Sequence, residues 1–167
     1  LSYLFLMIIK QFEINKINLD KTRFILFYGK NEGLKNQIKT KLLKNKIITS
    51  NLEEKDIIDK PDNFIESLLT QSLFENEKII FINRATDKIF KTLSEIIDKK
   101  IEKLIIIVNA DILEKKSKLR SFFEKDKNCV CIPIYLDTEQ TLFKLALEYV
   151  KIKKIPISTS DLNLIIN

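Results

Sequence analysis

Four short apolar runs, separated from one another by helical patterns, limit the folds that this chain can adopt. The runs lie at residues 24–28, 78–83, 104–108 and 129–134. A run that is apolar at nearly every position is typical of a strand buried on both faces of a sheet. Because strands that alternate with helices form mostly parallel sheets, the pattern predicts an α/β fold over residues 24–134, with helices on both sides.

The segments between these runs carry apolar side chains at helical spacing. Helices are predicted over residues 33–43, 61–71, 87–100 and 116–125. The second of these helices begins at Pro61 and carries an inward stripe of Phe64, Ile65, Leu68 and Leu69. Ile47 and Ile48 predict a further short strand.

The pattern becomes purely helical towards the C-terminus. Asp137 or Thr138 can cap one helix, and Ser158 can cap another. We therefore expect an α/β domain over residues 7–137 and the start of a helical domain over residues 138–167. The closing apolar stripe around Leu164 is unfinished, so we expect the chain to be part of a longer protein.

Composition disfavours catalysis by the usual groups. The 167 residues include no histidine, which is the commonest general base and the commonest metal ligand, so we expect no metal site and no catalytic site. The 29 basic and 23 acidic side chains give a net charge of +6, but acids and lysines are interleaved, which favours nucleic-acid contact only weakly. Cys129 and Cys131 lie two apart on an apolar run and are expected to be buried thiols in a reducing cytoplasm.

The apolar N-terminus does not predict a membrane protein. Residues 1–9 have no basic leading region and no small-residue cleavage site, and they are too few to span a bilayer. We therefore expect neither a signal peptide nor an anchor, and a cytoplasmic location. Met7 is the expected natural start, with Leu1 to Leu6 as upstream sequence.

A loop that partly matches a phosphate-binding loop follows the first apolar run. Counted from Gly29, Lys35 falls at the position of the phosphate lysine. However, Leu34 stands where a glycine is needed for the backbone to wrap a triphosphate, and Asn36 replaces the hydroxyl that would bind magnesium. On spacing alone, a plain turn from strand to helix with a solvated lysine is the favoured interpretation, and ATP hydrolysis is not expected under either one.

Three segments, taken in order, resemble the delta subunit of bacterial DNA polymerase III clamp loaders. They are Phe-Ile-Leu-Phe-Tyr-Gly-Lys-Asn-Glu-Gly-Leu from Phe24, Leu-Leu-Thr-Gln-Ser-Leu-Phe ahead of Lys-Ile-Ile-Phe-Ile-Asn-Arg-Ala, and Leu-Glu-Lys-Lys-Ser-Lys-Leu-Arg-Ser-Phe-Phe-Glu-Lys from Leu113. The resemblance implies an AAA+/RecA-like parallel sheet flanked by helices, without a working nucleotide site, and the start of a small helical lid domain. A C-terminal collar domain, which would contact the other loader subunits, is not in this sequence.

The resemblance also implies a partner and a binding element. In the delta family an apolar pair at a helix end enters a pocket of the beta sliding clamp, and the matching residues here are Ser72, Leu73 and Phe74. The residues alone favour Leu73 and Phe74 as a cap of the core, and the resemblance favours them as a binding element instead. Gln71 lies closer to the phenylalanine than in common clamp-binding peptides, so its role stays open.

Two other functions remain open at this stage. A P-loop-related NTPase with an unusual loop would turn over ATP. A basic nucleic-acid-binding module would bind DNA in a salt-dependent way, but the sequence shows no interleaved aromatic cluster and no recognition helix. Through the resemblance, DNA contact is expected only within a larger complex.

Overall fold

The computed structural model of the protein describes residues 11–72 and 77–166. The strands are β1 (Phe24–Tyr28), β2 (Ser50–Glu53), β3 (Lys78–Ala85), β4 (Leu104–Ala110) and β5 (Cys129–Pro133). The helices around them are α1 (Glu32–Leu43), α2 (Glu54–Ile58), α3 (Pro61–Ser72), α4 (Phe90–Asp98) and α5 (Lys118–Lys125), with 3₁₀ helices at Gln11–Lys16 and Asp87–Ile89. Helices α6 (Glu139–Ile152) and α7 (Thr159–Ile166) follow. The chain divides into two compact units between Ile134 and Tyr135.

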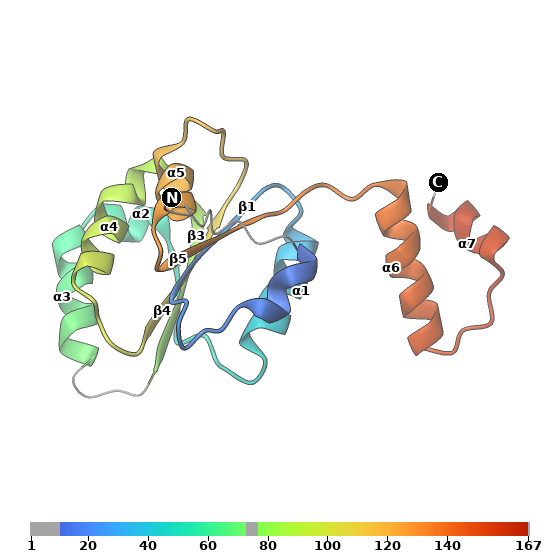
Figure 1. Ribbon diagram of the computed structural model, residues 1–167, viewed down its shortest axis with the longest axis horizontal. Helices are drawn as coiled ribbons and strands as arrows, with labels where there is room; N and C mark the ends of the chain where they lie inside the picture. Colours follow the sequence, from blue (N-terminus) through green and yellow to red (C-terminus); the bar gives the residue numbers. More distant parts are fainter. Residues whose placement is uncertain (1–10, 73–76, 167) are drawn as a thin grey trace, which may run out of the picture. The chain divides into compact units, whose positions relative to one another are not determined.

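The five strands form one parallel sheet in the order β2-β3-β4-β1-β5. Helices α2 to α5 cover one face, and α1 with the 3₁₀ helix Gln11–Lys16 covers the other (Figure 1). The predicted α/β fold, with a parallel sheet flanked by helices, is confirmed.

The central strands explain why the apolar runs are continuous. Along β1, Phe24, Leu26 and Tyr28 pack towards α2 to α5, whereas Ile25 and Phe27 pack towards α1. Strands β4 and β5 divide their side chains between the two faces in the same way. A strand between two helical layers has no solvated face, so every position selects an apolar residue. Both cysteines on β5 are buried, as predicted, and burial raises the pKa of Cys131 to about 12.

The edge strand β2 differs from the prediction. It spans Ser50–Glu53 rather than Ile47 and Ile48, and the side chain of Ile47 is 80% exposed. Pairing with β3 sets its register, and this pairing starts with Ser50 opposite Ile80. Just before the strand, the Thr49 hydroxyl donates a hydrogen bond to the backbone oxygen of Ile79. An edge strand is paired on one side only and needs little apolar character, so its polar sequence carried no strand signal.

The second unit consists of α6 and α7. Thr138 caps α6 in a reciprocal arrangement with Thr141, and the Ser158 hydroxyl accepts a hydrogen bond from the backbone N–H of Asp161 at the start of α7. Both caps lie at positions that the sequence predicted. Within residues 11–72 and 77–166, no helix has both the length and the apolar character needed to cross a bilayer.

Polar side chains join the helices at the carboxyl end of the sheet. Buried Glu54 accepts hydrogen bonds from the backbone N–H and hydroxyl of Thr86. The next residue, Asp87, accepts bonds from the Ser117 hydroxyl at 2.6 Å and from the backbone N–H groups of Lys118 and Leu119 at 3.1 and 3.0 Å. Asp87 therefore caps α5 from another element and fixes where that helix begins.

The Asp87 cap predicts a dependence of stability on pH. Partial burial alone would raise the pKa of Asp87, but the hydrogen bonds from Ser117, Leu119 and Lys118 outweigh it and hold the pKa below the ordinary value of 3.8. The carboxylate therefore stabilises the fold above about pH 4, and this contribution is lost as the pH falls through the lowered pKa. Asp87→Ala should lower the free energy of unfolding by about 0.5–2 kcal/mol at neutral pH.

Urea unfolding of both proteins at neutral pH and at about pH 3 measures this effect. The difference between the native protein and Asp87→Ala should shrink at the lower pH. Asp98→Ala, at the exposed end of α4, is the matched control and should change little at either pH. A difference that stays constant with pH would show that the carboxylate charge is not the source of the stability.

Candidate functional site

Gly29 is required by packing between two strands. It has φ +129°, and a Cβ there would lie 1.9 Å from the backbone oxygen of Ile134. Its backbone N–H donates to the Asp111 oxygen at 3.1 Å, while the N–H of Ile134 donates to the Tyr28 oxygen at 2.8 Å. The chain leaving β5 thus crosses directly against the loop. Close backbone approach accounts for this glycine without any phosphate.

The rest of the loop forms an ordinary helix start. Asn31 caps α1, and its side-chain oxygen accepts from the backbone N–H of Leu34 at 3.0 Å. In a phosphate-binding loop the backbone N–H of Leu34 would face the anion, but here it is already bonded to Asn31. Gly33 has no close neighbour, since a Cβ there would meet only the Asn31 side-chain oxygen at 3.6 Å.

Lys35 is turned into the protein. Its side chain is only 3% exposed, and Nζ donates to the Ala110 backbone oxygen at 2.8 Å and to Glu32 Oε1 at 2.7 Å. Glu32 also accepts a bond from Asn109 on β4 at 3.3 Å. The ammonium group at the position of a phosphate lysine therefore ties α1 to the end of β4. The prediction of a solvated lysine is therefore wrong. The buried ammonium group obtains its hydrogen bonds from the protein itself.

The end of β3 also differs from a magnesium site. Asn83 and Arg84 stand where an acid would hold the metal. Asn83 donates its side-chain amide to Asn51 at 2.6 Å, and Arg84 Nε pairs with Glu53 at 2.7 Å. Both contacts join β3 to the edge strand β2. Across residues 11–72 and 77–166, no group of three or more Cys, Asp or Glu side chains is placed to hold a metal ion.

The Ser-Lys-Leu-Arg segment has a structural role at α5. Ser117 caps the helix through Arg120 N, and Leu119 is fully buried. Arg120 donates to Glu124 at 2.7 Å and to the Leu113 oxygen at 3.1 Å, and its guanidinium lies 4.9 Å from the Tyr28 ring centre. Only Lys118 is left exposed. Three of the four residues are therefore explained by the packing of α5 on β1 and β5.

The helix α3 leads to the predicted clamp-binding residues. Ser72 is its last residue, and Leu73 and Phe74 lie outside the described residues. Of the predicted inward stripe, Ile65 and Leu68 are buried and Phe64 is half-buried, but Leu69 is 38% exposed. The prediction that Leu69 faces inward is therefore wrong, because Ile65 and Leu68 already fill the side of the helix that faces the core.

Sequence reasoning missed one group of side chains. Phe90 and Phe122 come from different helices, yet their rings meet edge to face with centres 5.4 Å apart. Lysines from the loop before α5 and from α5 itself surround them. Neither phenylalanine stands out in the sequence, since each belongs to a helical pattern that predicts burial.

The solved structures that resemble this chain include the following three. A chain from a study of katanin self-assembly has 19% identity and a TM-score of 0.51, and the match covers 86% of this chain and 51% of that one. The Bacillus subtilis DNA clamp loader delta protein has 10% identity and a TM-score of 0.57, with 90% and 49% covered. Domain III of the Thermotoga maritima replication initiation protein DnaA has 15% identity and a TM-score of 0.49, with 94% and 72% covered.

The similarities to the katanin chain and to the clamp loader delta protein show the fold. The protein has an AAA+-like α/β fold, with a five-stranded parallel sheet between helical layers. The chain spans about half the length of the katanin chain and of the clamp loader delta chain. No protein-family model and no curated protein sequence matches it.

The two glycines of the loop should respond oppositely to the same substitution. Gly29→Ala places a Cβ against the Ile134 oxygen at a positive φ, so it should lower the free energy of unfolding by at least about 2 kcal/mol. Gly33→Ala lies in open space on α1 and should raise it by roughly 0.5–1 kcal/mol. Chemical denaturation of the two variants provides the comparison. Equal stability of both would contradict the packing role of Gly29.

Proposed function

We propose that this chain is the front part of a delta-type clamp-loader subunit, which binds a DNA sliding clamp and helps to open it during DNA replication without hydrolysing ATP. The observation that carries the proposal is the Lys35 ammonium group, which is bonded to the Ala110 oxygen within an AAA+-like fold. The likeness in fold to the Bacillus subtilis clamp loader delta protein supports it. In this proposal, residues 7–137 are the AAA+-like domain and residues 138–167 begin a helical lid.

A filled loop suits a subunit that acts by binding. A triphosphate would need the Lys35 ammonium, the backbone around Leu34 and a metal-binding hydroxyl at residue 36. Lys35 is already bonded within the protein, Leu34 N is bonded to Asn31, and residue 36 is Asn. Such a domain keeps the shape of a nucleotide-binding domain while using its surfaces to contact partners.

We place the clamp-binding element at the end of α3, in Ser72, Leu73 and Phe74. The supporting observation is Leu69, which is 38% exposed one helical turn before Leu73 in the sequence. The helix is held to the core by Ile65 and Leu68. Apolar side chains beyond them add little to folding, whereas burial in a partner's pocket would contribute on the order of 1.5–3 kcal/mol each.

Substitution of Lys35 separates a structural lysine from a phosphate-binding one. Lys35→Met removes the donor to Ala110 and should lower the free energy of unfolding by about 1–3 kcal/mol, because a buried carbonyl is left unpaired. The native protein and the variant should both show no ATP·Mg²⁺ binding by calorimetry. Lys41→Met, on the exposed face of α1, is the control and should leave stability nearly unchanged.

Two results would contradict this interpretation of the loop. One is micromolar ATP affinity or phosphate release by the pure native protein, which would support a P-loop-related NTPase. The other is a Lys35→Met protein that is as stable as the native one.

The clamp-binding element is tested by changing Leu73 and Phe74 together to alanine. We expect binding to the cognate sliding clamp to weaken by at least about tenfold, with a change of about 0.5 kcal/mol or less in stability. A clamp titration and a thermal melting curve measure the two quantities. Leu69→Ala should weaken binding by a smaller factor, because it would lie at the edge of the contact.

The matched control is the double variant Ile112→Ala, Ile152→Ala. These isoleucines are 61% and 70% exposed and belong to the loop after β4 and to α6, so they remove exposed apolar area without changing α3. The control should bind the clamp like the native protein. A large fall in melting temperature for the Leu73 and Phe74 variant would instead identify those residues as core, since each would then cost roughly 2–5 kcal/mol.

A further inference from the structure

A shallow hollow lies on the α/β unit along α5, beside the start of α4. Its volume is about 760 Å³. The aromatic rings of Phe90 and Phe122 line it together with the lysines Lys115, Lys116, Lys118 and Lys125. The clamp-binding element proposed at the end of α3 does not include any of these residues.

The two rings form an apolar surface that the core does not cover fully. Phe90 and Phe122 are each half-buried, and their rings meet at 75°. Phe122 also packs edge to face against Phe123, which is fully buried, with ring centres 5.8 Å apart. The rings are therefore held in place from beneath while part of each stays accessible. An accessible aromatic ring is a surface on which a flat π-system can stack.

The rim of the hollow is positively charged. Residues 114–127 carry six basic and three acidic side chains, a net of +3 out of +6 for the whole chain. Two of the acids are ion-paired, Glu114 with Lys116 and Glu124 with Arg120. The third, Asp126, also lines the hollow and accepts a hydrogen bond from the backbone N–H of Asn128. Within the described part of the chain, Lys115, Lys118 and Lys125 form no ion pair within 4 Å.

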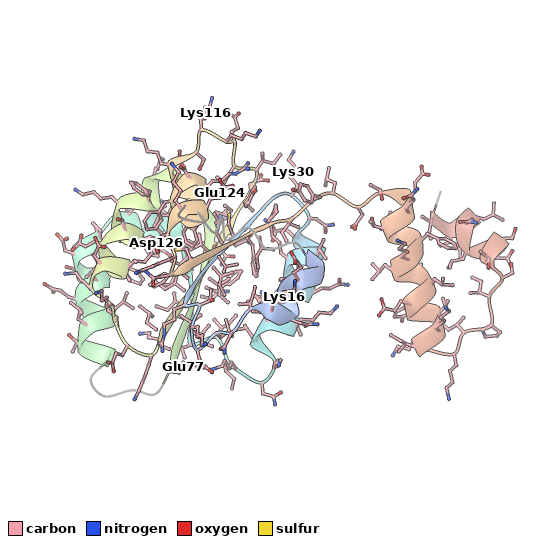
Figure 2. The ribbon with its side chains drawn as sticks, viewed as in Figure 1. Lys16, Lys30, Glu77, Lys116, Glu124 and Asp126 are labelled. Carbon is pink, nitrogen blue, oxygen red and sulfur yellow. The ribbon has the colours of Figure 1, made fainter. Side chains whose placement is uncertain are left out.

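The lysine side chains, rather than the helix end, are available to an anion. The first backbone N–H groups of α5 already donate to Asp87, so they are not open to a phosphate. Figure 2 shows Lys116 at the tip of the loop before α5, with its side chain directed away from the sheet. Flexible ammonium groups bind phosphates as point charges without fixing a sequence.

We propose that this hollow binds single-stranded nucleic acid, with phosphates on Lys115, Lys118 and Lys125 and a base against the accessible faces of Phe90 and Phe122. Interleaved cations and accessible rings match a strand in which charges alternate with flat bases. A duplex hides the faces of its bases, so it could use the lysines but not the rings. An acidic peptide would likewise satisfy the charges and leave the rings without a stacking partner.

The loop before α5, which borders the hollow, and the described end of α3 lie at opposite edges of the sheet. Helices α4 and α5 begin at the carboxyl ends of the strands, whereas α3 ends near the amino end of β3. Figure 2 shows Lys30 and Lys116 at one end of the sheet and Glu77 at the other. The two surfaces can therefore be changed independently, and failure of one proposal leaves the other intact.

The test is fluorescence anisotropy of a labelled oligothymidine of about twelve nucleotides with the 167-residue chain. The triple variant Lys115→Glu, Lys118→Glu, Lys125→Glu should lose at least about tenfold in affinity and should show a smaller dependence on salt. The control triple Lys21→Glu, Lys41→Glu, Lys44→Glu makes the same change in net charge at exposed positions outside the hollow. It should lose less than about threefold.

Phe122→Leu tests stacking separately from charge. It should weaken binding several-fold while leaving the salt dependence unchanged, since the phosphate contacts remain. A melting curve checks that the variant is folded. If it is not, Phe90→Leu, which removes the other ring, tests stacking in its place. Clamp binding should be unaffected by all of these variants, and the Leu73 and Phe74 variant should bind oligothymidine normally.

Three outcomes would overturn the proposal. They are equal losses for the two lysine triples, binding of a matched duplex as tightly as the single strand, and displacement of the oligonucleotide by an equally long poly-glutamate peptide at the same concentration. The first would indicate a general charge effect, the second a backbone-only contact, and the third an acidic peptide partner.

Discussion

The Lys35 ammonium group and the Ala110 carbonyl form the contact on which the carboxyl edge of the sheet depends. A buried cation is costly unless it is paired and hydrogen-bonded, and Lys35 obtains both conditions from Glu32 and the end of β4. The ammonium group at the position of a phosphate lysine is thus bonded within the protein, and these contacts hold this edge of the sheet together. Nearby, the chain after β5 lies against Gly29 and closes the loop from the other side.

Periodicity predicted the centre of the fold better than its edge. Strands β1, β4 and β5 lie between two helical layers, so their sequences are apolar at almost every position and could be located closely. Strand β2 has a neighbour on one side only, and its sequence Ser-Asn-Leu-Glu carries no apolar pattern. The strand was predicted at Ile47 and Ile48 because these residues are apolar, but pairing with β3 begins three residues later, at Ser50.

The candidate site was less predictable because its geometry depends on residues far apart in the chain. Spacing located Lys35 but could not show that its partner would be Ala110, which is 75 positions away. The two loop glycines look alike in sequence, yet only Gly29 faces a neighbouring backbone. Likewise, Phe90 and Phe122 follow ordinary helical patterns, and only the packing of α4 beside α5 brings their rings together. Helical periodicity describes one element and does not specify which element lies next to it.

The contacts that hold the loop after β1 have a physical consequence for the surfaces of the domain. In a parallel α/β sheet, helices begin at the carboxyl ends of the strands and return to the amino ends. A ligand-binding loop couples these edges only if its conformation changes with the ligand. Here the loop is held by Lys35 and by the close contact at Gly29, so its conformation is set by contacts within the protein. Under the two proposals, such a domain would hold one partner at the end of α3 and another along α5, and no change in this loop would be needed for either contact.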